Sequence, residues 1–189
     1  MPIEIQSQAP LDTRAFIELE KLEKNLSEEW LLAHLVPIIT QTTRVSIRLM
    51  DWLVTNYSKE QKVLYTWTSG NIERIFDLHY EYKMTLDRYG RPFFDPFRRG
   101  NRVFFKVEND RYETTIGQLI FWVWAESHGV ISYCSEHADI IETHMTTTHH
   151  TRDKRKNESK QRKRMSLSHA PEMKCFIFPM ETKVTFNDK

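Results

Sequence analysis

The segment with the clearest chemical potential is a basic run near the end of the chain. Eight of the thirteen residues from 152 to 164 are Lys or Arg and two are acidic, so the run carries a net charge of +6. The 189-residue chain has a formal net charge of +1, which leaves −5 for the remainder. Dense Lys and Arg bind polyanions by releasing condensed counterions. The residues predicted to bind nucleic acid here are Arg152, Lys154, Arg155, Lys156, Lys160, Arg162, Lys163 and Arg164.

Two other interpretations of the basic run stay open. Short Lys/Arg-rich segments also serve as nuclear import signals, and a charged linker can simply be solvated. The separation of positive from negative charge favours polyanion binding, because a general gain in solubility does not require it. No base-reading motif accompanies the run, so the predicted binding is sequence-nonspecific.

A second stretch, from residue 80 to residue 102, mixes six aromatic residues with six Lys or Arg and three acids. Aromatic rings stack on unpaired bases, and guanidinium groups hold phosphates. We therefore add Arg98, Arg99 and Arg102 to the predicted nucleic-acid interface. The alternative is that about half of the aromatic residues face the core while the arginines pair with the acids or cover apolar surface.

A group of Cys and His residues offers a weak zinc site. Cys134 and His137 have the spacing of a ligand pair, and thiolate and imidazole are ligands that Zn²⁺ prefers. On a helix, however, His144 would lie roughly 10 Å beyond His137, too far for one ion. We therefore expect a buried Cys with exposed His beside it, and we expect no metal and no cofactor.

Motifs of the common enzyme classes are missing. The five glycines include no G-x-G pair, and the chain has no G-x-S-x-G and no H-E-x-x-H, which are the marks of nucleotide-binding loops, serine hydrolases and zinc proteases. We expect a protein that is not an enzyme. Two cysteines make no disulfide framework, and no apolar run approaches the roughly 18 residues of a membrane helix. We expect an intracellular protein, in the nucleus or the cytoplasm, that is not secreted and not bound to a membrane.

The elements that must position these residues follow from periodicity. The apolar pattern predicts an α+β fold, a helix-rich single domain with a small sheet of three to four strands that the C-terminal strands complete. Helices are predicted over 12–24, 27–36, 43–57, 71–90 and 115–129 and from 131 onward, and strands over 62–67, 101–107, 174–178 and 182–186. The helix at 115–129 begins with Thr115 and Gln118, which have the spacing of a capping box. It is apolar nearly all round, so it is either deeply buried or docked on a partner.

These elements divide the chain into four parts. Residues 1–11 are expected to form a loose arm, and residues 12–145 a helical α+β core. Residues 146–171 are a basic linker or an extension of the preceding helix. Residues 172–189 are expected to return to the core as strands.

Three fragments together resemble a known family. They are DWLVTNYSKEQKVLY at 51–65, FFDPFRRGNRVFF at 93–105 and ETTIGQLIFWVWA at 113–125. The family is a set of uncharacterised proteins shared among large nucleocytoplasmic DNA viruses, and the resemblance covers about residues 51–186. It implies a viral setting, either as a virion component or as a factor that handles viral DNA. It supplies no activity and no catalytic residue.

Two functional hypotheses result. The first is a non-enzymatic viral protein that associates with nucleic acid, DNA rather than RNA, through the basic segment. The alternative is a virion structural or adaptor protein, a minor capsid or core component, that grips other proteins through aromatic anchors. Those anchors would be Phe93, Phe94, Phe97, Trp122 and Trp124.

Overall fold

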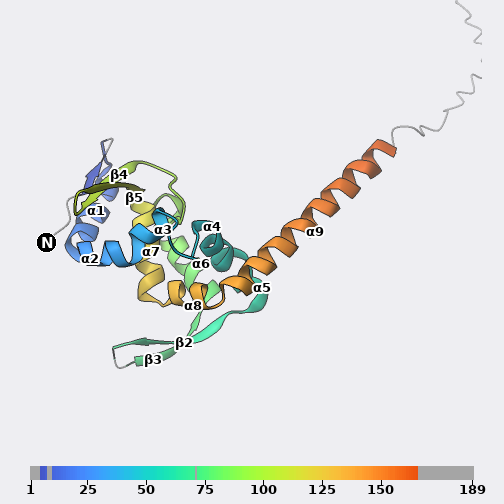
Figure 1. The fold of residues 1–189 in the computed structure, drawn as a ribbon, viewed down its shortest axis with the longest axis horizontal. Helices are drawn as coiled ribbons and strands as arrows, with labels where there is room; N and C mark the ends of the chain where they lie inside the picture. Colours follow the sequence, from blue (N-terminus) through green and yellow to red (C-terminus); the bar gives the residue numbers. More distant parts are fainter. Residues whose placement is uncertain (1–4, 8–9, 71, 166–189) are drawn as a thin grey trace, which may run out of the picture. The chain divides into compact units, whose positions relative to one another are not determined.

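The computed structural model describes residues 5–7, 10–70 and 72–165, with the side chains of Ser69 and of residues 152–165 outside that description. The chain divides into two units, residues 1–148 and 149–189. The first unit contains all the described strands and all the described helices except the last part of α9 (Figure 1).

The first unit is helix-rich, with two small antiparallel sheets, so the predicted α+β class is confirmed. Its helices are α1 Thr13–Asn25, α2 Glu28–Trp30, α3 Val36–Ile39, α4 Ile47–Trp52, α5 Ser58–Gln61, α6 Leu78–Tyr89, α7 Ile116–Ser127, α8 Val130–Glu136 and the beginning of α9 Ala138–Met165. Two π-helical turns, η1 Leu31–Leu35 and η2 Leu53–Tyr57, join α2 to α3 and α4 to α5, and η3 Arg91–Phe93 is a 3-10 turn. The strands are β1 Ile5–Ser7, β2 Leu64–Ser69, β3 Ile72–Asp77, β4 Arg102–Val107 and β5 Asp110–Thr115.

The three-stranded sheet has the order β1-β4-β5, with Ile5 opposite Phe105 and Phe105 opposite Tyr112. Its third strand is therefore the segment Ile5–Ser7, where the sequence predicts a loose arm. The Ile5 side chain is buried in the core, and this burial explains why so short a strand is held in place. The predicted C-terminal strands at 174–178 and 182–186 lie outside the described residues.

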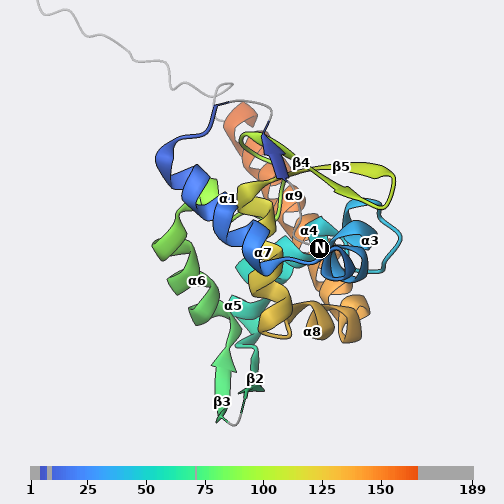
Figure 2. The same cartoon turned by 90° about the vertical axis from the view of Figure 1, so that its left-hand side faces the viewer.

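The apolar spacing of the segment 71–90 predicts one helix, but the structure contains a strand followed by a helix there. Residues Ile72–Asp77 form β3 and pair with β2, and the helix begins only after Asp77, whose carboxylate accepts a hydrogen bond from the Tyr80 backbone N–H. Cross-strand contacts decide the outcome, because Phe76 packs on Tyr65 while Ile72 and Ile75 remain 69% and 75% exposed. The hairpin extends from the helices in both views (Figures 1 and 2).

Helix α7 is the centre of the core. It begins at the predicted cap, where the Thr115 hydroxyl accepts a hydrogen bond from the Gln118 backbone N–H at 3.1 Å. Nine of its twelve residues are buried, and α7 lies among α1, α6 and α8 (Figure 2). Of the two expectations for this helix, burial in the core is what the structure shows.

The loop after α6 packs closely on the first turn of α7, and Gly117 makes this contact possible. A Cβ atom at Gly117 would lie 2.7 Å from the carbonyl oxygen of Pro92. Next to it, the buried Gln118 side chain donates to the Pro96 carbonyl at 2.8 Å and accepts from the Thr114 hydroxyl at 2.9 Å. The FDPF segment (residues 94–97) is therefore held by helix α7 and not by its own sequence alone.

Candidate functional site

The basic segment forms the C-terminal half of α9. The backbone is helical without interruption from Ala138 to Met165, so residues 152–164 are a helix extension and not an extended linker. At 1.5 Å per residue, the thirteen residues cover about 20 Å of helix. This one continuous helix carries two clusters of three cations, Lys154 to Lys156 and Arg162 to Arg164. We call these residues the six clustered cations.

The first turns of α9 are anchored in the first unit through His144. The Trp52 indole N–H donates to His144 Nδ1 at 3.1 Å, and His144 Nε2 lies 2.9 Å from a carboxylate oxygen of Glu60. The imidazole also meets the edge of the Tyr57 ring. An ion pair between Arg44 and Asp139 adds a contact at the start of the helix. Sequence reasoning assigned no role to His144, because its partners lie more than eighty residues earlier in the chain.

The three arginines added from the aromatic stretch are matched by acids of the chain itself. Arg99 makes two hydrogen bonds to the Asp95 carboxylate, at 2.7 and 2.9 Å. Arg102 lies 3.3 Å and Arg98 4.0 Å from the Glu113 carboxylate. The alternative interpretation, in which arginines pair with acids, describes this part of the chain. We therefore leave Arg98, Arg99 and Arg102 out of the predicted nucleic-acid interface.

Three of the five proposed partner anchors are core residues. Phe94, Trp122 and Trp124 are 1%, 0% and 7% exposed, respectively, so most of their surface is already used within the fold, and the prediction that they anchor a partner loses support. Phe93 and Phe97 are half-buried, and each lies under a guanidinium group, that of Arg14 at 4.5 Å and that of Arg99 at 4.9 Å.

The two weak zinc candidates, Cys134 and His137, differ in burial, since Cys134 is buried and His137 is half-buried. Cys134 is fully buried, and burial raises the pKa of its thiol to about 12, so the thiolate that a metal requires is disfavoured. The His137 ring stacks on Tyr133, and its Nδ1 lies 3.0 Å from the Tyr133 carbonyl. Across the part of the chain that the structure describes, no three His, Cys, Asp or Glu residues are grouped in a way that could hold a metal ion.

A polar cavity that the sequence did not predict lies between α4, η2, α6 and the FDPF segment. We call it the Asp51 cavity. Its volume is about 550 Å³. Asp51 and Thr55 line it from α4 and η2, Tyr82 lines it from α6, and Arg91, Asp95 and Arg99 line it from the loop. Its signal in the sequence was Asp51, an acid that lies between the apolar residues Met50 and Trp52 along the chain.

Burial and neighbouring charges shift the pKa values of the groups that line the Asp51 cavity. Burial, and secondly the charge of Asp95, raise the pKa of the Asp51 carboxyl, while Arg99 and Arg91 act in the opposite direction. Burial is also the main reason that the pKa of Tyr82 rises to about 12, with Asp51 and Asp95 adding to it. Arg99 donates two hydrogen bonds to the Asp95 carboxylate, which raises the pKa of Arg99, and the two opposite charges neutralise each other on one side of the cavity.

The raised pKa of Asp51 predicts a pH-dependent cost to stability. Because its folded-state pKa lies above the ordinary 3.8, the folded protein binds this proton more tightly than the unfolded chain does. The stability that protonated Asp51 contributes to the fold is full below the unfolded-state pKa and is lost as pH rises through the folded-state pKa. We expect Asp51→Asn to unfold at a higher temperature than wild type at pH 7 and at nearly the same temperature at pH 3.

Thermal unfolding followed by circular dichroism at both pH values measures this difference. Asp87→Asn, an exposed position on α6, is the matched control and should show no comparable gain. A wild type that is more stable than Asp51→Asn at pH 7 would mean that the arginines outweigh the burial of the carboxyl.

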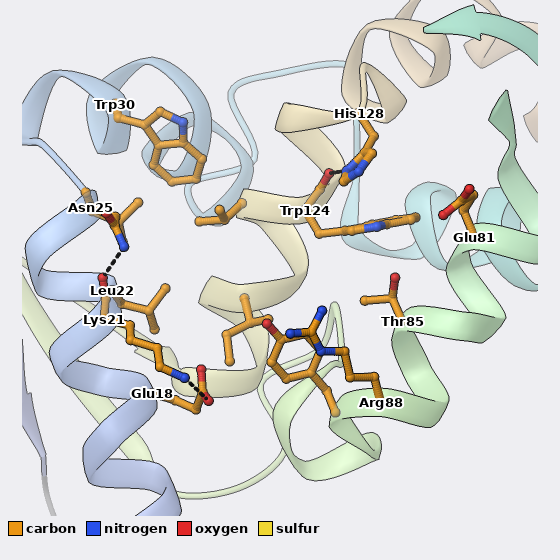
Figure 3. A pocket seen from close by; sticks show the side chains of 14 residues that line it. Glu18, Lys21, Leu22, Asn25, Trp30, Glu81, Thr85, Arg88, Trp124 and His128 are labelled. Atoms are coloured by element: carbon orange, nitrogen blue, oxygen red, sulfur yellow. Dashed lines mark hydrogen bonds and ion pairs between the residues drawn. The ribbon is translucent and has the colours of Figure 1, made fainter. Parts of the chain in front are cut away.

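A second hollow is the groove between α1 and α6, with α7 as its floor (Figure 3). Its volume is about 540 Å³. Leu22 and Trp124 contribute apolar surface, and Glu18 and Lys21 form an ion pair of 2.8 Å on the α1 side. Thr85 and Arg88 face them from α6. The groove combines an apolar floor with a charged rim.

These features define a helix-rich α+β protein with a polar cavity between α4, η2, α6 and the FDPF segment, and no solved structure matches it. The chain belongs to the family of unknown function DUF7197, whose model matches residues 12–174. It is 36% identical over 135 residues to an uncharacterised protein of Acanthamoeba polyphaga mimivirus, an alignment that covers 67% of this chain and 52% of the relative. The chain thus spans about half the length of that relative.

Both findings confirm the resemblance to a family shared by large DNA viruses that the three sequence fragments indicate. None of the described helices is both long enough and apolar enough to cross a membrane.

Proposed function

We propose that this protein associates with nucleic acid, DNA rather than RNA, through the helical basic segment of residues 152–164. The binding is electrostatic and sequence-nonspecific, and the proposal assigns it no catalysis. The protein would act in a viral setting, within the infected cell or in the virion.

The observation that carries the proposal is the match between charge and structural units. Residues 1–148 hold sixteen Lys and Arg against twenty-one Asp and Glu, a net of −5, while residues 149–189 hold eleven against five, a net of +6. A polyanion is therefore attracted to the second unit and repelled by the first. This arrangement supports binding through one element and argues against a general, diffuse affinity.

The internal pairing of Arg98, Arg99 and Arg102 supports the same conclusion. A phosphate at these residues would have to compete with Asp95 or Glu113, at distances of 2.7 to 4.0 Å. Binding through the strand edge would thus separate existing ion pairs, whereas the basic segment has eight cations and two acids within thirteen residues. The virion adaptor alternative loses support, because three of its five anchors lie in the core.

A salt titration tests the proposal on the wild-type protein. If about six phosphates are neutralised on duplex DNA, the logarithm of the binding constant should fall with the logarithm of salt concentration at a slope near −5. Single-stranded DNA should give a shallower slope, about −4. Fluorescence anisotropy with labelled oligonucleotides of unrelated sequences measures both slopes. A slope shallower than about −2, or a strong preference for one sequence, would contradict the proposal.

A further inference from the structure

The Asp51 cavity contains polar groups that the fold does not satisfy. Tyr82 is 7% exposed, yet its hydroxyl has no hydrogen-bond partner among the described residues, and it lines the cavity. The Asp51 carboxylate and the Arg91 guanidinium, which line the same cavity, likewise make no hydrogen bond within the described part of the chain. Tyr82 is buried, Asp51 is half-buried and Arg91 is exposed, so these three unpaired groups open onto the cavity and are available to a ligand.

The Asp95–Arg99 pair lines one side of the cavity and limits which polar groups there remain available to a ligand. Asp95 is held by Arg99 and by the Phe97 backbone N–H at 3.2 Å, so its oxygens are already engaged. The remaining functional groups are one carboxyl, one guanidinium and one phenol. They can recognise a molecule with an anionic group for Arg91 and an N–H donor for Asp51. An inorganic anion satisfies Arg91 alone and is repelled by Asp51.

We propose that the Asp51 cavity binds a mononucleotide, with the phosphate at Arg91 and an exocyclic amino group of the base at Asp51. Guanidinium groups suit phosphate geometry, and a carboxylate accepts hydrogen bonds from base amino groups. The rings of Tyr82 and Phe94, whose centroids are 5.7 Å apart, line the cavity and pack against each other. A volume of about 550 Å³ is within the usual range for small-molecule sites.

The stability cost of Asp51 is consistent with a functional role. A half-buried carboxyl with a raised pKa and no hydrogen bond lowers the stability of the fold at neutral pH, and such groups are typical of binding sites. The cavity also begins at η2, a π-helical turn that carries Thr55, and π turns inside helices occur frequently at functional sites.

Calorimetric titration of the full chain with single nucleotides tests this proposal. The panel is AMP, GMP, CMP and UMP, with ribose 5-phosphate as the base-free probe. We expect the three nucleotides with an exocyclic amino group to bind. UMP should bind about tenfold more weakly, because it presents a carbonyl oxygen where CMP presents an amino group. Ribose 5-phosphate should be weaker by at least about tenfold, since it lacks the contact with Asp51.

Three variants assign the contacts. Arg91→Gln should weaken every nucleotide about tenfold, because the charged contact to phosphate is lost. Asp51→Asn should reduce the discrimination between CMP and UMP, because an amide can donate to a carbonyl as well as accept from an amino group. Arg48→Gln, an exposed position one turn before Asp51 on α4, is the matched control and should leave binding unchanged.

Four results would overturn the proposal: no binding of any nucleotide at millimolar concentration, equal binding of UMP and CMP, equal binding of ribose 5-phosphate, or an equal loss in Arg48→Gln and Arg91→Gln. Since Asp51→Asn is expected to be more stable than wild type at pH 7, loss of folding does not obscure its result. A variant with Gln in place of the six clustered cations of α9 should bind CMP as wild type does. That arm separates this cavity from the proposed polyanion binding, so either proposal can fail alone.

Discussion

Replacing six cations of α9 with Gln is expected to lower the affinity for duplex DNA by about a hundredfold or more at 100 mM salt. The positions are Lys154, Lys156, Lys163, Arg155, Arg162 and Arg164. Each contact to phosphate releases a condensed counterion, so the loss of six contacts removes most of the electrostatic binding energy and flattens the dependence on salt. Gln has a helix propensity close to that of Lys and Arg, so the helix itself should persist. Anisotropy titrations in parallel with circular dichroism give both readouts.

The control for this prediction carries the same change in net charge elsewhere. Gln at six exposed cations of the first unit takes the chain from +1 to −5, as the α9 variant does. Those positions are Lys24, Arg48, Lys59, Lys62, Lys83 and Lys106. We expect only a small loss of affinity in this control. Equal losses in the two variants would show that net charge, and not the segment, governs binding.

Phe94→Ala is expected to cost about 3–5 kcal/mol of folding stability, the largest effect predicted for a single residue here. Phe94 is 1% exposed, and its ring contacts those of Tyr82, Phe121 and Trp124 at centroid distances of 5.3 to 5.7 Å. Removing the ring leaves a cavity at the junction of α6, α7 and the FDPF segment. Chemical denaturation followed by tryptophan fluorescence measures the loss.

Phe93→Ala is the matched comparison, because the two phenylalanines are adjacent and differ in burial. Phe93 is half-buried beneath the Arg14 guanidinium, and its truncation should cost about 1 kcal/mol. If the two substitutions cost the same, the FDPF segment does not pack on α7 as described. A large loss of partner binding in Phe94→Ala without any loss of stability would restore it as a surface anchor.

Local features of the sequence predict helix α7 and strand β4 correctly. Thr115 and Gln118 predict the start of α7, and the apolar residues that follow predict its burial or docking, because caps and hydrophobic periodicity act within one or two turns. The strand at Arg102–Val107 was predicted from its β-branched and aromatic residues. The structure of the segment 71–90 was not predicted correctly, because its apolar spacing suits both a strand and a helix. The pairing of Phe76 with Tyr65 decides between the two.

The Asp51 cavity could not be predicted for a related reason. Asp51 and Asp95 are forty-four positions apart, and neither has a local motif that links it to the other. The pairing of Arg102 with Glu113 depends in the same way on the register of β4 against β5. The sequence by itself determined where the charge is concentrated, which helix is apolar and where that helix begins, because these are properties of neighbouring residues. The tertiary structure alone decided which arginines are neutralised, which aromatic residues are buried and which polar groups meet in a cavity, because those outcomes depend on contacts between distant segments.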